Sequence, residues 1–149
     1  MSDSILVKAR VQSREAGEAG ALVALIPYAG FLGVRMHRQD QQWLSHLPFR
    51  PGLIGNPALQ ALHGGVTAAF MENAAMLHLL VQLDEDRIPK NIDFSIDYLL
   101  PGRARDLYAA CTVSRAGLRV AQVQIRCWQD SPEQPIAMAR AHFLLGKPA

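Results

Sequence analysis

Cysteine is scarce in this chain, and the two that occur exclude several kinds of site. Cys111 and Cys127 are the only cysteines among the 149 residues. They form no CxxC pair, and neither pairs with a histidine at the spacing of a metal site. We therefore expect no metal centre, and we expect both thiols to pack in the core of a protein from a reducing compartment.

Charge is also low and is spread along the chain. Charged residues make up 19% of the sequence, and the formal net charge of +2 at pH 7 is too small to indicate binding to nucleic acid. No block of like charges indicates a tail or a membrane-binding face. The N-terminal residues carry charges where a signal peptide requires an apolar run. We expect a soluble protein of the cytoplasm.

Two familiar catalytic patterns are missing as well. No GxSxG sequence occurs, so a serine hydrolase would lack its nucleophile elbow. Four histidines have neither the spacing of metal ligands nor a nearby group of acids, and we expect them to be packing or surface residues. They are His37, His46, His78 and His142.

What the chain does contain is the material for one ordinary domain. Half of its residues are hydrophobic, which is enough for a core without disulfides. The polar pattern of residues 2–20 predicts a helix, so we assign residues 1–30 to an N-terminal helical extension and 31–149 to the main domain. Within the main domain, residues 31–38 and 41–47 predict a hairpin of two strands.

A long apolar segment follows this hairpin. Prolines and glycines over residues 49–57 predict a loop. Residues 64–83 then carry apolar side chains at helical spacing on every side, which predicts a helix buried on all sides. The same stretch is a poor membrane span, because it contains polar residues such as Glu72 and His78.

Everything after Pro89 reads as strands. Apolar residues alternate with polar ones, beginning with Ile92, Phe94, Ile96 and Tyr98, and turn signals separate about four strands. The simplest arrangement is an α+β hotdog fold, in which a strongly curved antiparallel sheet wraps around the long helix. Such a sheet has an exposed edge, so we expect a dimer.

Glu72 is the only ionised side chain between Gly64 and Leu83, and no cationic residue lies within helical reach of it. Removing an unpaired carboxylate from water costs several kcal/mol or forces its protonation. Two interpretations fit. Glu72 is a catalytic carboxylate, or it faces a wet dimer seam or pairs with an arginine from elsewhere.

His63-Gly64-Gly65 precedes this helix. Glycines at a helix start allow close approach of a ligand, and the free N–H groups there bind negative charge. The Gly65 amide is therefore a candidate oxyanion donor, although close packing of the helix start explains glycines equally. Glu72 lies seven residues after Gly65, so a substrate would have to span about two helical turns.

These residues resemble a known family, the PaaI-like acyl-CoA thioesterases of the hotdog superfamily. The resemblance covers roughly residues 56–145. It rests on three motifs: HGGVT at 63–67 with Glu72-Asn73 nine residues after the histidine, DFSIDYLLP at 93–101, and AMARAHF at 137–143. It implies hydrolysis of an acyl-CoA to a free acid and coenzyme A. Coenzyme A is then part of the substrate, and no cofactor is expected.

The resemblance also implies roles for individual residues. Glu72 matches the catalytic acid, Gly65 the glycine whose amide polarises the carbonyl, and His63 a positioning group. Asn91 matches a small polar residue that contacts water or substrate. Asn56 lies seven residues before His63, where the family has an asparagine six before, and this departure leaves its role open. The family forms homodimers, often homotetramers, whose active sites draw on both subunits.

Several residues are candidates for binding the substrate. Arg103, Arg105, Arg115 and Arg119 are candidates for the phosphates of coenzyme A, and a solvated charged rim is the alternative for each. Apolar residues of the long helix, Met76 among them, are candidates for lining an acyl tunnel.

Two other functions remain open at this point. A hotdog dehydratase acting on 3-hydroxyacyl thioesters needs a histidine and an acid astride its substrate, for which His63 and Glu72 would serve. A binding module would hold an acyl thioester without turning it over. The context of the HGG motif favours the thioesterase.

Overall fold

The computed structural model describes residues 3–146. The helices are α1 (Asp3–Ala16), α2 (Gly20–Val23), α3 (Pro27–Leu32), the single 3-10 turn η1 (Pro51–Leu53) and α4 (Gly64–Gln82). The strands are β1 (Arg35–Gln39), β2 (Gln42–Leu47), β3 (Ile54–Asn56), β4 (Ala61–Leu62), β5 (Lys90–Tyr98), β6 (Leu107–Ala116), β7 (Val120–Trp128) and β8 (Ala137–Leu144).

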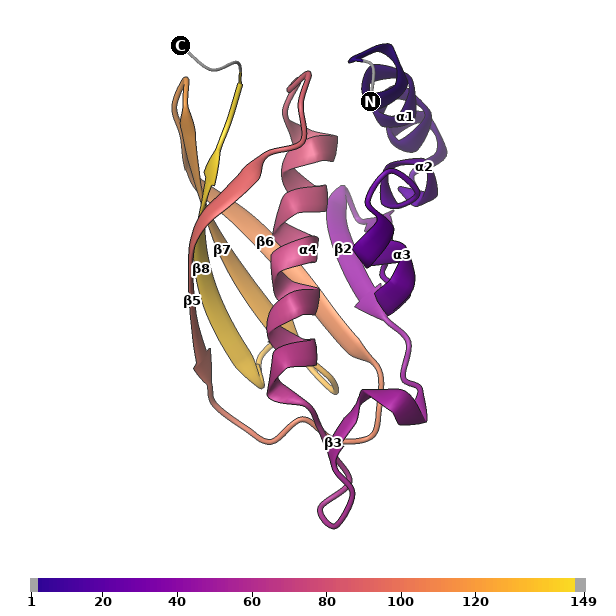
Figure 1. Ribbon diagram of the computed structural model, residues 1–149, viewed down its shortest axis with the longest axis vertical. Coiled ribbons are helices and arrows are strands. Elements are labelled where there is room, and N and C mark those ends of the chain that lie inside the picture. The colour runs from indigo at the N-terminus through magenta and orange to yellow at the C-terminus, as the bar shows by residue number, and fades with distance from the viewer. Residues whose placement is uncertain (1–2, 147–149) are drawn as a thin grey trace.

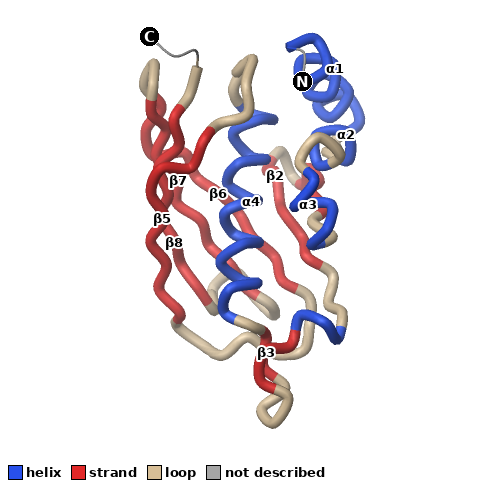
Figure 2. The backbone as a smooth tube through the Cα atoms, in the orientation of Figure 1, coloured by secondary structure: helices blue, strands red, loops and turns tan. Residues whose placement is uncertain are grey.

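Six of the strands form one curved sheet, in the order β1-β2-β6-β7-β8-β5, and every neighbouring pair is antiparallel. The helix α4 runs along the inner face of this sheet, and α1–α3 lie together beside it (Figure 1). Figure 2 shows the same division, with the strands behind α4 and the β3–β4 hairpin below its start. The predicted hotdog arrangement is confirmed.

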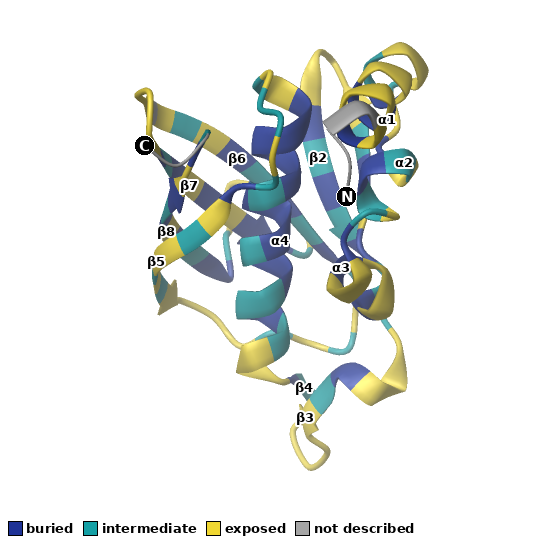
Figure 3. Cartoon of the chain, turned by 45° about the horizontal axis from the view of Figure 1, so that its top comes forward, coloured by how far each residue is buried: buried dark blue, intermediate teal, exposed yellow. Residues whose placement is uncertain are grey.

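Burial of apolar side chains fixes α4 on the sheet. Its buried residues include Phe70, Ala74, Leu77 and Val81, which recur at helical spacing. By length and composition α4 could cross a membrane. However, 61% of the apolar 18-residue stretch that meets this test is buried inside the protein, as in a core helix. The prediction of burial on all sides is nevertheless too strong. One stripe stays half-buried (Figure 3); its members are Val66, Ala68, Ala69, Glu72 and Met76.

The N-terminal region differs in detail from its prediction. The first helix ends at Ala16, not at residue 20, because Gly17 adopts a left-handed φ of 69°. The strand predicted over 31–38 starts only at Arg35. Pro27 begins α3 instead, and Gly33, with a φ of 90°, ends it. The three helices therefore continue to Leu32, and all three pack against α4.

Arginines from this region hold the end of α4. Arg10, which is 3% exposed, donates from Nε to the Leu80 carbonyl at 2.6 Å and from Nη2 to the Glu85 carbonyl. Arg14 donates from Nε to the Val81 carbonyl at 2.8 Å. The last carbonyls of a helix have no partner within it and carry the negative end of its dipole, so cations there are stabilising.

Two other predictions need correction. Residues 49–57 are not a plain loop, because they contain η1 and β3, and β3 pairs with β4 immediately before α4. Ile92 does not share the buried side of β5, because a bulge between Asn91 and Asp93 leaves it 53% exposed. The two cysteines pack in the core as predicted, where burial raises the pKa of the Cys127 thiol to about 12.

Candidate active site

The start of α4 is built around His63, which is its N-cap residue. The ring Nδ1 of His63 accepts a hydrogen bond from the Gly65 N–H at 2.9 Å, so the proton of the neutral imidazole lies on Nε2. The His63 carbonyl accepts from the N–H groups of Val66 at 3.0 Å and Thr67 at 3.3 Å. Within residues 3–146, the Gly64 N–H has no acceptor.

This arrangement distinguishes the Gly64 and Gly65 amides as candidate oxyanion donors, which the sequence alone does not. The Gly65 amide, which the family resemblance implies as the oxyanion donor, already donates to His63. The adjacent Gly64 amide is free and lies at the first position of the helix, where the helix dipole favours a negative ligand.

Tyr98, the last residue of β5, also reaches this helix start. Its hydroxyl donates to the Gly64 carbonyl at 2.7 Å. From the sequence, Tyr98 is only one of the alternating strand residues. Its position immediately before the LLP of the strand motif was the one signal available, and it does not indicate a contact 34 residues away in sequence.

A pocket of about 320 Å³ opens beside these residues. Gly64, Thr67 and Tyr98 line it together with apolar residues, which are Ala61, Leu62, Leu99, Leu100, Pro101, Gly102 and Ile136. A smaller pocket of about 110 Å³ shares Leu100, Pro101 and Ile136 with it and continues to Arg103 and Arg105. The two pockets adjoin through these three residues, and we refer to them together as the groove between Gly64 and the two arginines.

Gln129 holds the segment that carries these arginines. Its Oε1 accepts from the Arg103 N–H at 2.9 Å, and its Nε2 donates to the carbonyls of Arg103 at 2.9 Å and Arg105 at 3.1 Å. The Arg105 guanidinium pairs with Asp130 at 2.8 Å, whereas that of Arg103 is exposed and has no partner in the part of the chain described. No motif in the sequence points to Gln129.

The four arginines predicted to bind phosphate do not form one group. Arg119 lies in the β6–β7 hairpin, at the end of the sheet away from the start of α4 (Figure 1). There it lines a different pocket with His142 and Val120. Arg115 is in β6, but its side chain lies outside the described part of the structure.

Glu72 lies near the middle of α4 on the half-buried stripe, with Met76 one turn further along. No hydrogen bond or ion pair joins its carboxylate to any residue within 3–146, so the alternative of pairing with an arginine of the same subunit is not realised there. Glu72 follows Gly64 by eight residues, about 12 Å along the axis. It does not line the pocket at Gly64.

The two asparagines make local hydrogen bonds. The Asn56 Oδ1 accepts from the N–H groups of Ala58 at 3.1 Å and Leu59 at 3.3 Å and so shapes the β3–β4 turn. The Asn91 Oδ1 accepts from the Asp93 N–H at 3.1 Å in the β5 bulge. Asn91 is seven residues from Tyr98 on the same strand, about 23 Å. Neither side chain lines the pocket at Gly64.

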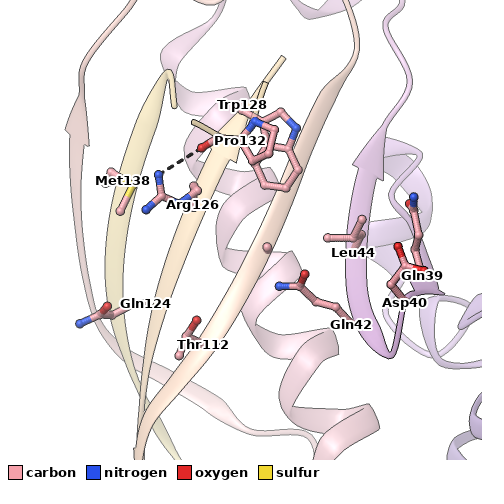
Figure 4. A pocket seen from close by; sticks show the side chains of 11 residues that line it. Gln39, Asp40, Gln42, Leu44, Thr112, Gln124, Arg126, Trp128, Pro132 and Met138 are labelled. Atoms are coloured by element: carbon pink, nitrogen blue, oxygen red, sulfur yellow. Dashed lines mark hydrogen bonds between the residues drawn. The ribbon is translucent and has the colours of Figure 1, made fainter. Parts of the chain in front are cut away.

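A further pocket of about 420 Å³ lies on the other side of the sheet, turned away from α4 (Figure 4). Trp128, Met138 and Leu44 line it, and Arg126 donates to the Pro132 carbonyl at its rim at 3.1 Å. It contains none of the candidate residues. Among residues 3–146, no three histidine, cysteine, aspartate or glutamate side chains are placed to hold a metal ion.

Comparison with known proteins decides the family. The model of the thioesterase superfamily matches residues 59–136, which span β4, the whole of α4, the strands β5–β7 and the loop that follows. The chain belongs to the thioesterase superfamily. The prediction of a thioester hydrolase of hotdog fold is confirmed at this level.

Individual relatives of this thioesterase-superfamily chain agree. The chain is 31% identical over 136 residues to the medium/long-chain acyl-CoA thioesterase YigI of Escherichia coli K12, covering 81% of this chain and 86% of YigI. A crystal structure of a Chromobacterium violaceum protein is 40% identical with a TM-score of 0.74, covering 94% and 95% of the two chains.

A third relative bears on the PaaI-like resemblance. The structure of a phenylacetic acid degradation-related protein from Ralstonia eutropha has a TM-score of 0.70 at 20% identity, covering 80% of this chain and 89% of that one. At that identity it shows a shared fold.

Proposed function

We propose that this thioesterase-superfamily protein hydrolyses acyl-CoA thioesters, with Glu72 as its catalytic carboxylate. The observation that carries the proposal is the carboxylate of Glu72, half-buried on an otherwise apolar helix and without a partner among residues 3–146. The same helix begins with a free amide beside a pocket. The relative YigI, named for medium and long acyl-CoA chains, supports this class of substrate.

The Gly64 amide is the oxyanion donor in this proposal. The substrate carbonyl oxygen accepts its hydrogen bond, which strengthens as negative charge develops on that oxygen. The Gly65 amide serves instead only if His63 releases it. Because the Gly65 N–H donates to His63 Nδ1 at 2.9 Å, we assign the role to Gly64.

The distance of about 12 Å between Gly64 and Glu72 on one helix requires the carboxylate to come from elsewhere. A second copy of the chain supplies it. The edge strand β1 is covered, since Ala19 donates to the Met36 carbonyl and Arg38 to the Gly17 carbonyl. The other edge, β5, carries no covering segment within the described residues, so it is the edge through which a homodimer forms.

In the reaction, Glu72 of the second subunit takes a proton from water as the water oxygen attacks the thioester carbon. The tetrahedral intermediate then collapses, the C–S bond breaks, and the thiolate takes up the proton. Attack by Glu72 itself, through an anhydride that water later hydrolyses, uses the same residues. Thiolate is a good leaving group, so neither route needs a strong general acid or a cofactor.

Coenzyme A follows the groove over Leu100 and Pro101. Its pantetheine arm fills the pocket next to Gly64, and its phosphates reach Arg103, whose guanidinium is exposed and unpaired among the described residues. Arg105 is the second contact, once its pair with Asp130 is shared or exchanged.

One assay tests the proposal against its alternatives. The protein is incubated with short, medium, long and aromatic acyl-CoAs, and free thiol, unsaturation and thermal stability are followed together. Thiol release supports hydrolysis, and formation or hydration of a double bond without thiol release supports a dehydratase. Thermal stabilisation without either reaction supports a binding module.

The Glu72→Gln variant completes the test. It keeps the shape of the side chain and removes its basicity, so turnover should fall about 10²- to 10⁴-fold. Glu15→Gln, the same change on an exposed residue of α1, is the control. Full activity in Glu72→Gln would end the proposal.

A further inference from the structure

The peptide unit between Gly64 and Gly65 is held at both of its polar ends. Its oxygen accepts from the Tyr98 hydroxyl at 2.7 Å, and its N–H donates to the His63 ring at 2.9 Å. One partner comes from the end of β5 and the other from the helix cap. The orientation of this peptide plane is therefore set by two side chains rather than by the helix alone.

Tyr98 also packs directly on Gly64. A Cβ placed on Gly64 would lie 3.3 Å from the Tyr98 hydroxyl oxygen and 3.4 Å from the ring carbon that carries it. Within a single subunit Tyr98 is 55% exposed, so packing against its own chain does little to hold its ring. The contact is one that a glycine permits and most other residues would disturb.

Two consecutive glycines need such support. Glycine has more backbone freedom than any other residue, and restricting that freedom costs free energy. If a catalytic amide were ordered only during the reaction, this cost would add to the activation barrier. The N–H and the carbonyl of Gly64 are linked through the φ and ψ angles of that residue. The Tyr98 hydrogen bond holds the carbonyl and therefore restricts the direction of the N–H. A donor whose direction is fixed in advance stabilises an oxyanion better than a mobile one.

We infer that Tyr98 is a positioning residue for hydrolysis, which orients the Gly64 amide toward the thioester oxygen by holding the Gly64 carbonyl. This inference rests on the proposed function and adds a residue to it. Tyr98 lines the same pocket as Gly64, so it lies beside the reacting group while acting through the peptide. A simple structural tie between β5 and α4 is the competing role.

The test compares Tyr98→Phe with Tyr28→Phe. Both remove one hydroxyl from a tyrosine of similar exposure, 55% and 52%, but Tyr28 lies in α3, and no hydrogen bond of its hydroxyl is found within residues 3–146. We expect kcat of Tyr98→Phe to fall about 3- to 10-fold, the effect of one neutral hydrogen bond, with KM little changed. Tyr28→Phe should match the wild type.

Two coenzyme A analogues separate positioning from structure. An acyl-CoA trifluoromethyl ketone forms an oxyanion in the site, whereas a thioether analogue lacks the carbonyl. Tyr98→Phe should bind the ketone more weakly by the same factor as kcat falls, and should bind the thioether as the wild type does. An unchanged kcat, or equal weakening of both analogues with a lower Tm, would overturn the inference.

Amide hydrogen exchange distinguishes failure of this inference from failure of the proposed function. Inactivity of the wild type on every acyl-CoA would refute the hydrolytic function and with it any role of Tyr98 in hydrolysis. If the wild type is active but the Gly65 amide exchanges equally fast in wild type and Tyr98→Phe, the peptide is not held by Tyr98 and only this inference fails.

Discussion

The two ends of α4 are built in opposite ways. Its start consists of His63 and two glycines, is exposed, and leaves the Gly64 amide without an acceptor among residues 3–146. At its end Leu80 and Val81 are buried, and Arg10 and Arg14 of α1 donate hydrogen bonds to their carbonyls. Both ends carry a partial charge of the helix dipole. Side chains of the protein stabilise one end, and in the proposed mechanism the other end binds the substrate carbonyl.

The difference assigns separate tasks to the two halves of the helix. The arginines bring a segment from 67–75 residues away to hold α4 in place. The start can then remain open and glycine-rich without the helix losing its position.

Among changes at the two ends of α4, the largest effect is expected from removing the free amide at the open end. Proline is well tolerated at the first position of a helix, and His63 has the extended conformation that a following proline requires, with φ −64° and ψ 129°. Gly64→Pro therefore deletes the N–H and keeps the helix, and kcat should fall about 10²- to 10³-fold.

Gly64→Ala is the matched control for this change. It adds a Cβ at the same place, 3.3 Å from the Tyr98 hydroxyl oxygen, but keeps the N–H. The ratio of the two kcat values isolates the amide. Equal turnover in both variants would show that the Gly64 N–H is not the donor.

A mutation at the end of α4 that the arginines hold should lower the unfolding free energy and leave kcat unchanged. Arg10→Ala leaves the carbonyls of Leu80 and Glu85 without their buried donor, which should cost about 3 kcal/mol of unfolding free energy. Urea unfolding measures the loss, with Lys8→Ala, an exposed change on the same helix, as the reference. The kcat of the folded fraction should stay unchanged. A variant of wild-type stability would contradict the capping role of Arg10.

His78 is buried in the second half of α4 and should make the unfolding free energy of the protein depend on pH. It is 7% exposed, its Nδ1 has no partner within residues 3–146, and burial lowers its pKa to about 4. Below pH 6.5 the unfolded chain takes up a proton that the folded protein refuses, so stability is complete above pH 6.5 and falls toward pH 4. The loss between pH 7 and pH 5 should be about 2 kcal/mol.

Unfolding free energies measured across this range provide the check. In His78→Leu the contribution should vanish, while His37→Leu, a half-exposed site on β1, should keep it. A His78→Leu protein with the pH dependence of the wild type would assign the effect to other groups.

The smallest effect concerns the arginines at the two ends of the sheet. If the phosphates of coenzyme A follow the groove from Gly64, Arg103→Ala should raise KM about 3- to 5-fold at low salt without changing kcat, as loss of one exposed charge contact does. Arg119→Ala, at the opposite end, should leave KM unchanged. Steady-state measurement of KM for both variants at two salt concentrations tests this prediction. A raised KM in Arg119→Ala but not in Arg103→Ala would place the phosphate site at the β6–β7 hairpin.

The sequence was sufficient for the elements with a strong period. The helix predicted over 64–83 and the strands β5–β8 were recognisable because their apolar residues recur regularly over eight residues or more. The helices α2 and α3 were missed because four and six residues are too few for a period to show. The bulge that exposes Ile92 breaks the alternation only in three dimensions.

The site was predictable in its composition but not in its contacts. Glu72 stood out because an unpaired acid in an apolar helix is rare. The choice between Gly64 and Gly65 depends on where the His63 ring turns, which no spacing reveals. Tyr98, Gln129 and Arg10 act across 24–75 residues of sequence, so only the folded chain brings them to their partners.

Mixed dimers test most directly whether Glu72 of one subunit acts in the same site as the Gly64 amide of the other subunit. Glu72→Gln and Gly64→Pro chains should each be nearly inactive, and refolding an equal mixture should restore about one quarter of wild-type turnover, because half of the dimers contain one intact site of two. A mixture no more active than its separate components would contradict the account.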